Sequence, residues 1–228
     1  MRLYYKYILG FVIIMLMHAC LNEPKSEEAK VGEAETAKEV EHPMTNYYLP
    51  EPHHITWIGT KPTGRHNGTI RLSQGFVSVR NDSILGGKFT LDMNDIHILD
   101  LESDPANHDK LSNHLKSPDF FDVANHPHGY FVLTRIEPYT SESEEDLSVE
   151  GANSMVTGNL TLRDSTLSVT FPSRVYLTDS IISVAANFNI DRTRWGVSYR
   201  DETKVSNKIK DKFIHNKVNI GFDIEIKK

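Results

Sequence analysis

Apolar and polar residues alternate with a period of two in almost every segment after residue 53, and this pattern constrains the fold most. Ile55 and Trp57, for example, flank Thr56. The alternation recurs at Phe89–Met93, Phe131–Leu133, Leu160–Leu162, Val169–Phe171, Val184–Ile190 and Val218–Ile226. A period of two indicates half-buried strands rather than helices. Because strand follows strand without helices between them, the pattern predicts an all-β fold with antiparallel pairing, a sandwich or a barrel.

One segment departs from this period. Between Pro105 and Pro118 the sequence ANHDKLSNHLKS places Leu111 and Leu115 four residues apart among polar residues. This spacing predicts one short amphipathic helix, capped near Asn107 or Asp109. About eight strands in residues 49–228 would then close a barrel that is either filled by its own side chains or able to hold one small ligand.

The first twenty residues have the pattern of a targeting segment. Arg2 and Lys6 precede the run Ile8–Met17, which is apolar except for one glycine and ends shortly before Cys20. Ten residues in a helix extend about 15 Å, half the thickness of a bilayer core, so the run is too short to span a membrane. A charged start, a short apolar stretch and a small residue before the cut are typical of a secretory signal.

Because the segment ends at the chain's single cysteine, it resembles a bacterial lipoprotein signal, whose cysteine is acylated and becomes the mature N-terminus. We therefore expect a signal peptide at residues 1–19, lipidation of Cys20, and an exported protein anchored in the periplasm or outer membrane. An ordinary cleaved signal with a chance cysteine is the alternative. Residues 20–48 are rich in glutamate and nearly devoid of large apolar groups, which predicts a disordered acidic tether.

Composition and motifs exclude several classes of function. The 25 Lys and Arg against 31 Asp and Glu leave a net charge of −6, which argues against a nucleic-acid partner. A single cysteine excludes internal disulfides and zinc sites with several thiolates. No phosphate-binding loop, nucleophile elbow or dinucleotide fingerprint is present. The eleven histidines have no strong ligand spacing, so we expect no metal, no catalytic residue and no enzyme.

Four motifs, in order along the chain, point to a known family. The first is the W-x-G-x-K-x-x-G-x-H-x-G string that begins at Trp57, and the second begins at Asn107-His108 and continues through His114 to Val123. The third is the hairpin of Gly158 to Thr166, with Asp164 at a position that is usually glycine, and the last is F-x-I-D-R-x-x-W-G from Phe188. Together these strings resemble the YceI-like family.

The resemblance implies a lipocalin-like, extended antiparallel barrel of exported bacterial proteins that bind long isoprenoid-type lipids, without assigned enzymatic activity. On that basis we expect inward-facing strand residues to bind the lipid. These are Trp57, Phe89, Leu91, Met93, Phe131, Leu133, Phe171 and Phe188, and Trp195 either joins them or plugs one end. Cations near turns are the candidates for an anionic head group, namely Lys61, Arg65, His66 and Lys88.

The predicted function is therefore the binding or carriage of an elongated apolar ligand, a polyisoprenoid or quinone-like lipid, with no other cofactor. Two alternatives stay open at this stage. One is a filled barrel that acts as an envelope stress or interaction module through its surface. The other is a metal- or haem-associated electron-transfer partner that uses histidines such as His126 and His128. The sequence leaves the oligomeric state open, a homodimer included.

Overall fold

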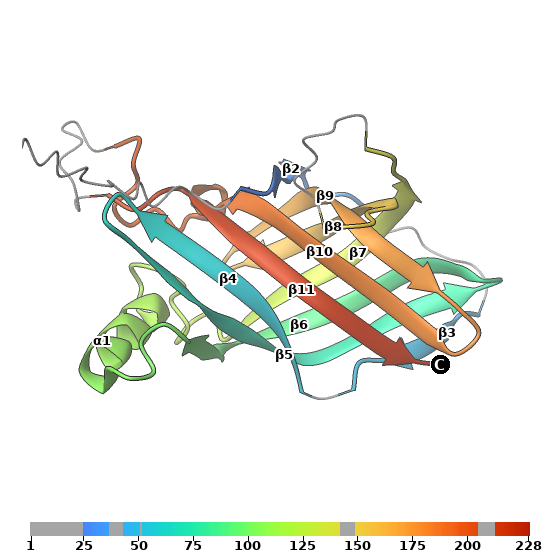
Figure 1. Cartoon of the computed structure of the whole chain (residues 1–228), viewed down its shortest axis with the longest axis horizontal. Helices are drawn as coiled ribbons and strands as arrows, with labels where there is room; N and C mark the ends of the chain where they lie inside the picture. The colour runs from blue at the N-terminus through green and yellow to red at the C-terminus, as the bar shows by residue number, and fades with distance from the viewer. Residues whose placement is uncertain (1–24, 37–42, 51, 142–148, 205–212) are drawn as a thin grey trace, which may run out of the picture.

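The computed structural model describes residues 25–36, 43–50, 52–141, 149–204 and 213–228. Eight antiparallel strands form a closed barrel, as the alternation predicts, in which each strand pairs with its neighbour in the chain and the last returns to the first (Figure 1). The strands are β4 (His53–Lys61), β5 (Gly64–Arg80), β6 (Ser83–Ile98), β7 (His128–Pro138), β8 (Ser154–Leu162), β9 (Ser165–Leu177), β10 (Ile181–Asp191) and β11 (Lys217–Lys227).

The hairpin of β5 and β6 is the longest part of the barrel, and it bends. Three register shifts interrupt its ladder, at Ile70/Arg71, Leu72/Gln74 and Ser78/Val79. A bulge adds a residue to one strand and increases the local twist, which lets a long hairpin curve around a barrel. The Arg71 guanidinium at the first shift donates to Asp92 and Asp95, both at 2.7 Å, and ties the bulged region to β6.

The predicted helix is present as α1 (Pro105–Lys116), at one end of the barrel (Figure 1). Its N-cap is Asp104 rather than Asn107 or Asp109. The Asp104 carboxylate accepts a hydrogen bond from the Asn107 backbone N–H at 3.3 Å, and Pro105 occupies the first turn, where a missing N–H costs nothing. Leu115 is the buried residue of the helix.

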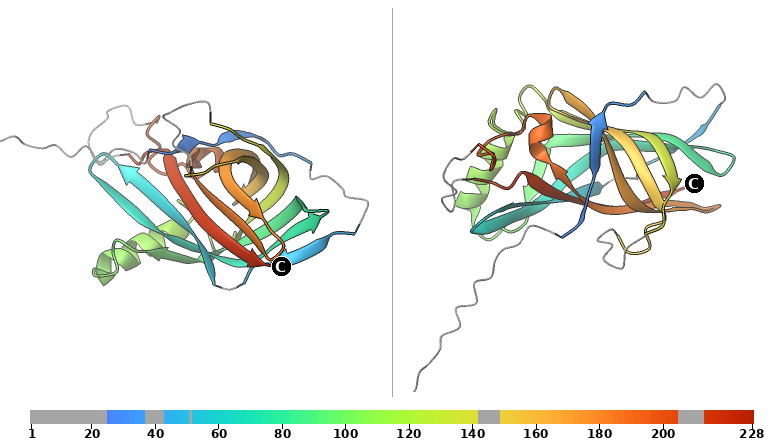
Figure 2. Two further views of the ribbon diagram at one scale, coloured as in Figure 1. Left: turned by 45° about the vertical axis from the view of Figure 1, so that its right-hand side comes forward. Right: turned by 90° about the horizontal axis from the view of Figure 1, so that it is seen from above.

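The prediction of a disordered tether is wrong for the part of residues 20–48 that the structure describes. This segment forms β1 (Glu27–Glu28), β2 (Lys30–Glu33) and β3 (Thr45–Tyr48), which pair with β10, β9 and β5 respectively (Figure 2). Composition did not predict these strands, because they are held by backbone hydrogen bonds to strand edges of the barrel rather than by burial of their own side chains. Residues 1–19 and Cys20 lie outside the described residues.

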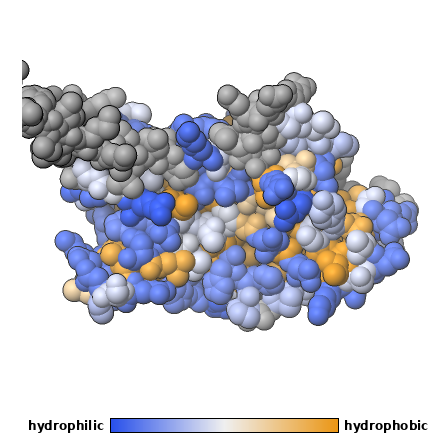
Figure 3. Space-filling view, in the orientation of Figure 1, coloured by the Kyte–Doolittle hydropathy of each residue, from blue (hydrophilic) through white to orange (hydrophobic). Residues whose placement is uncertain are grey.

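The face of the molecule shown in Figure 3 is mostly hydrophilic, with apolar residues gathered in patches between polar ones. The buried apolar residues form two clusters inside the barrel, one of which includes Leu91 and Ile98 and the other Phe171 and Trp195. A short 3-10 helix, η1 (Arg192–Trp195), follows β10. Within the described part of the chain no helix is long and apolar enough to cross a membrane.

Candidate functional site: a cavity inside the barrel

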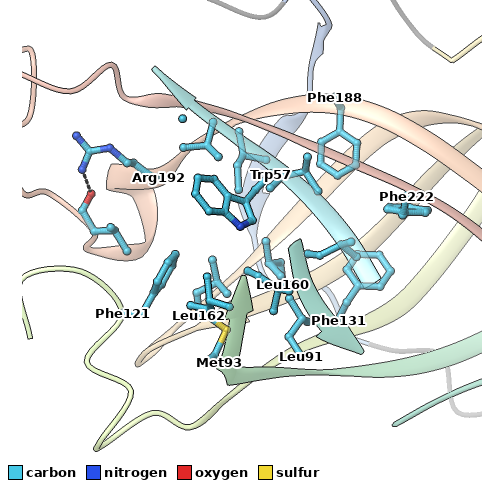
Figure 4. A pocket seen from close by; sticks show the side chains of 18 of the residues that line it. Trp57, Leu91, Met93, Phe121, Phe131, Leu160, Leu162, Phe188, Arg192 and Phe222 are labelled. Carbon is cyan, nitrogen blue, oxygen red and sulfur yellow. Dashed lines mark hydrogen bonds between the residues drawn. The ribbon is translucent and has the colours of Figure 1, made fainter. Parts of the chain in front are cut away.

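The barrel contains a cavity of about 500 Å³, part of whose lining is shown in Figure 4. Residues from all eight barrel strands contribute to its wall. The volume lies within the range of about 300–1,000 Å³ that is typical of ligand cavities. The alternation alone did not decide between a filled and a hollow barrel. The described residues form a hollow one. The interior can hold a ligand.

Most of the residues predicted to contact a ligand lie on the cavity wall. They are Trp57, Phe89, Leu91, Met93, Phe131, Leu133, Phe171 and Phe188. Trp195 is not part of the wall. Its side chain is buried, and the indole N–H donates to the Leu160 carbonyl at 2.9 Å, so it fastens η1 to β8 instead. Sequence reasoning missed further wall residues on the last strand, among them Ile220 and Phe222, although their alternation was visible.

The cavity is long and narrow. Along β11 every second residue from Val218 to Ile226 lines it. Eight residue steps of about 3.4 Å extend about 27 Å along the strand, and about 20 Å along the barrel axis at a typical tilt. A cavity of about 150 Å³ is known to bind benzene, so about 500 Å³ has room for about twenty carbon atoms by this comparison. The shape suits a single extended chain.

Glycines on neighbouring strands accommodate three of the aromatic rings on the wall. A Cβ on Gly68 would lie 2.7 Å from the Trp57 ring, one on Gly75 would lie 2.5 Å from the Phe89 ring, and one on Gly158 would lie 2.3 Å from Phe131 Cζ. Real Cβ atoms essentially never come this close. Each ring therefore occupies space that another residue's side chain would take, and it lies against the wall rather than further into the cavity.

Cationic side chains gather at the end of the cavity near α1. Three of them were predicted from the turn between β4 and β5, namely Lys61, Arg65 and His66. Three others line the same end and were not predicted for the cavity. These are Lys110 of α1, Arg192 and Arg200. The opposite end, near Ile182 and Ile226, is apolar. The cavity is thus polarised along its length, and we call the cationic end the mouth.

The prediction that Lys88 belongs to this group is wrong. Lys88 is exposed on β6, and its ammonium lies 5.2 Å from the centre of the Tyr130 ring. Its neighbour in sequence, Phe89, points into the cavity, and successive residues of a strand face opposite sides of the sheet. The alternation that places Phe89 inside therefore places Lys88 outside.

Ion pairs and hydrogen bonds order the mouth. His66 Nδ1 lies 2.7 Å from an Asp100 carboxylate oxygen, and the Asn67 N–H donates to the other oxygen at 2.8 Å. Burial opposes ionisation of Asp100, but these hydrogen bonds hold its pKa below the ordinary value. Asp100 therefore stays anionic beside His66, and the β4–β5 turn is tied to the end of β6.

Arg192 organises the segment that follows η1. Its guanidinium is buried and donates to the carbonyls of Val197 at 2.5 Å, Ile214 at 3.1 Å and His215 at 3.3 Å (Figure 4). Asp191, its neighbour in sequence, makes no hydrogen bond to it; the Asp191 carboxylate accepts from the backbone N–H and hydroxyl of Thr193 and caps η1. Adjacent residues at the end of a strand point apart, which separates the two charges.

Asp201 belongs to the same segment and is nearly inaccessible to solvent. It accepts hydrogen bonds from the Asn216 amide at 2.9 Å and from the Thr203 hydroxyl at 2.7 Å. The hydrogen bond from Asn216, followed by those from Thr203, lowers the pKa of Asp201 to about 2. The carboxylate thereby ties the segment after η1 to the residue that precedes β11.

Two buried polar atoms of residues on the cavity wall, Trp57 Nε1 and Thr60 Oγ1, have no hydrogen-bond partner among the described residues. The indole N–H of Trp57 is buried and unsatisfied, whereas the indole of Trp195 is paired. A buried donor without a partner costs about 1–3 kcal/mol. The Trp57 N–H can only donate, so an oxygen atom of a ligand placed beside it would gain a hydrogen bond.

The histidines considered for metal binding do not come together. In the described ranges of the chain no group of three or more histidine, cysteine, aspartate or glutamate side chains could hold a metal ion. His114 is instead packed edge-on between Phe120 and Tyr199, with ring centres 5.1 Å and 4.5 Å away. His126 lies near two carboxylates, Asp122 at 3.9 Å and Asp164 at 3.6 Å.

Comparison with known proteins places the barrel in a family. The crystal structure of BcnA from Burkholderia cenocepacia superposes with a TM-score of 0.56 and 16% identity, over 75% of this chain and 94% of BcnA. A polyisoprenoid binding domain from Saccharophagus degradans, implicated in plant cell wall breakdown, superposes with a TM-score of 0.50 and 11% identity, over 81% of this chain and 99% of the domain. No curated protein sequence matches significantly. The sequence model of the YceI-like domain matches residues 50–226, and the chain therefore belongs to the YceI-like domain family.

Proposed function

We propose that this protein binds one elongated apolar molecule, a polyisoprenoid or quinone-like lipid, in its barrel and catalyses no reaction. The observation that carries the proposal is the long, narrow cavity of about 500 Å³ with an apolar wall from all eight strands. The fold shared with a polyisoprenoid binding domain supports the same ligand class.

Burial alone would supply the affinity. Each CH₂ group removed from water contributes about 0.8 kcal/mol, so about twenty carbons contribute about 16 kcal/mol in total. Association and ordering cost about 4–15 kcal/mol. Only the surplus is available as affinity, so a long chain that fills the cavity binds and a short fragment does not.

The polarity of the cavity orients the ligand. The apolar end near Ile182 and Ile226 takes the tail, and the cationic mouth formed by Lys61, Arg65 and Lys110 takes a polar or anionic head. Between them, the unsatisfied Trp57 N–H would donate to a ligand oxygen. A quinone carbonyl, a hydroxyl group and a phosphate ester all offer such an oxygen.

A lipid anchor would bring the barrel to the membrane that stores such lipids. We propose that Cys20 is acylated and that the protein is exported, on the charged start and short apolar run before this cysteine. Metabolic labelling with a radioactive fatty acid tests this: Cys20→Ala should abolish label incorporation and release the protein from membrane fractions. Equal labelling of both proteins would contradict it.

Native mass spectrometry and solvent extraction of the purified full chain test the lipid-binding proposal. We expect a co-purifying isoprenoid, or saturable binding of an added polyprenol or isoprenoid quinone. Leu160→Trp adds a bulky ring to the wall and should abolish binding, whereas Lys88→Trp, on the outer face of β6, should leave it intact. Absence of bound lipid together with no saturable uptake would refute the proposal, as would full uptake by Leu160→Trp.

A further inference from the structure

The barrel wall has a seam between β9 and β10. Their ladder covers only the pairs from Ile182↔Leu177 to Ala186↔Ser173. On its other edge β10 pairs with β11 from Ile181 to Asp191, over its whole length. The part of β10 after Ala186 and the part of β9 before Ser173 are therefore not paired with each other. We call this unpaired part the lateral split.

The N-terminal segment occupies the lateral split. We call residues 26–35 the strap (Figure 2). Within it β1 pairs in parallel with β10 at Phe188 and Asn189, and β2 pairs antiparallel with β9 from Leu167 to Thr170. The Ala29 N–H also donates to the Asn189 carbonyl at 2.9 Å. Each edge of the split thus receives the backbone hydrogen bonds that the other edge does not provide.

The cavity lies directly behind the strap. Val169, Phe171, Phe188 and Ile190 come from the two edges of the split, and all four line the cavity. The rings of Phe171 and Phe188 stack across it, with centres 3.9 Å apart and planes 10° apart. On the strap, Ala29 and Val31 pack against the cluster that contains these residues. Displacement of the strap would expose the side of the cavity to the outside.

Polar contacts hold the strap at both ends. At its start the Ser26 hydroxyl donates to the Asn187 side chain at 2.7 Å, and the Asn189 amide donates to the Ser26 carbonyl at 3.0 Å. At its end Glu35 pairs with Arg135 of β7 at 2.9 Å and accepts from the Thr134 hydroxyl at 2.9 Å. Its apolar contribution is limited to two small, half-buried residues. Segments with few apolar contacts open at lower free energy than the core.

The strap lies outside the residues that the family model matches. The YceI-like domain match begins at residue 50, whereas the strap ends at residue 35. The split is therefore covered by residues from outside the matched domain. That segment begins six residues after Cys20, the proposed site of lipidation.

We propose that the lateral split is a second route into the cavity and that the strap is its removable closure. A lipid chain would pass sideways between β9 and β10 when the strap is displaced. This inference rests on the proposed function, because it concerns the route that the lipid takes.

A disulfide across the strap tests the route. Gly32 and Ser168 are register partners in β2 and β9, and a Cβ on Gly32 would meet no atom within 4 Å. Directly opposed Cβ atoms of an antiparallel pair are about 4.5–5.5 Å apart, near the range that a disulfide spans. The double variant Gly32→Cys/Ser168→Cys is made in the full chain with Cys20→Ser, so that the two cysteines can pair only with each other. Bond formation is checked by mass spectrometry.

The measurement is the transfer of a dansyl-labelled polyprenol from phosphatidylcholine vesicles to the protein. We expect the oxidised double variant to take up and release the probe at least tenfold more slowly than the reduced form, and a reductant to restore the rate. Each single-cysteine variant is the control and should behave alike with and without reductant. A second variant, Ala29→Asp/Val31→Asp, should accelerate exchange at least tenfold.

Equal transfer rates in the oxidised and reduced double variant would overturn the lateral route, whatever the aspartate variant does. If the reduced double variant binds no probe at all, the proposed function is refuted and the lateral route with it. Binding at normal affinity with unchanged rates removes only the route.

Discussion

Replacing Gly158 by alanine tests whether glycines keep the aromatic wall clear of the cavity. The new Cβ would lie 2.3 Å from Phe131 Cζ and 2.7 Å from the Val132 carbonyl oxygen. Ordinary contact begins at 3.4 Å, so the ring must move by about 1 Å, and the backbone oxygen cannot easily do so. Because Phe131 borders the cavity, the accessible direction for the ring is toward its centre.

The cost can be bounded from known substitutions. Forced overpacking in a core costs about 1–3 kcal/mol. Gly→Ala also restricts the unfolded chain, which stabilises the fold by about 0.4–1 kcal/mol. Gly59→Ala is the matched control, because its Cβ would meet no atom within 4 Å and its site also borders the cavity. The entropy gain is common to both variants, so their stabilities should differ by about 1–3 kcal/mol.

Thermal unfolding followed by circular dichroism measures the difference. For a domain of this size 1 kcal/mol corresponds to about 2–4 °C in Tm, so Gly158→Ala should melt about 2–12 °C below Gly59→Ala. Titration with a polyprenol should also show weaker binding by Gly158→Ala, because the displaced ring shortens the cavity. Equal melting temperatures and equal affinities would show that Phe131 does not depend on the missing side chain, and the reasoning would be refuted.

Three further predictions follow from the cavity and its mouth. Affinity for linear isoprenoid alcohols, measured by calorimetry, should rise about fourfold per added CH₂ and level off near about twenty carbons. A flat series would contradict the cavity dimensions. Trp57→Phe should weaken binding of an isoprenoid quinone by about five- to tenfold, which is the value of one hydrogen bond. Binding of the hydrocarbon squalene should stay unchanged, and equal losses for the two ligands would rule out Trp57 as donor. The pKa of Asp201 is lowered from 3.8 to about 2, so the stability that this carboxylate contributes is complete above pH 4 and is lost as the pH falls toward 2. Asp201→Asn should lack this loss of stability in acid unfolding, and identical profiles of the two proteins would refute the prediction.

The sequence alone determined the fold class and eight apolar residues of the cavity wall. Alternation is a local property, because successive residues of a strand face opposite sides whatever the strand pairs with. Trp57, Phe89 and Phe131 could therefore be assigned to the interior before any pairing was known, and the four family motifs indicated the barrel. The same alternation places Lys88, the residue before Phe89, on the outer face of the barrel, so it also excludes Lys88 from the cavity wall.

Only the tertiary structure decided whether the interior is hollow and what closes it. The seating of Phe131 over Gly158 depends on the register of β7 and β8, and the pairing of Glu35 with Arg135 joins residues 100 positions apart. Neither strand register nor pairing between distant residues can be read from the sequence around a residue. Both depend on which strand edges remain free once the barrel has closed. For that reason an acidic segment with the composition of a tether becomes part of the wall.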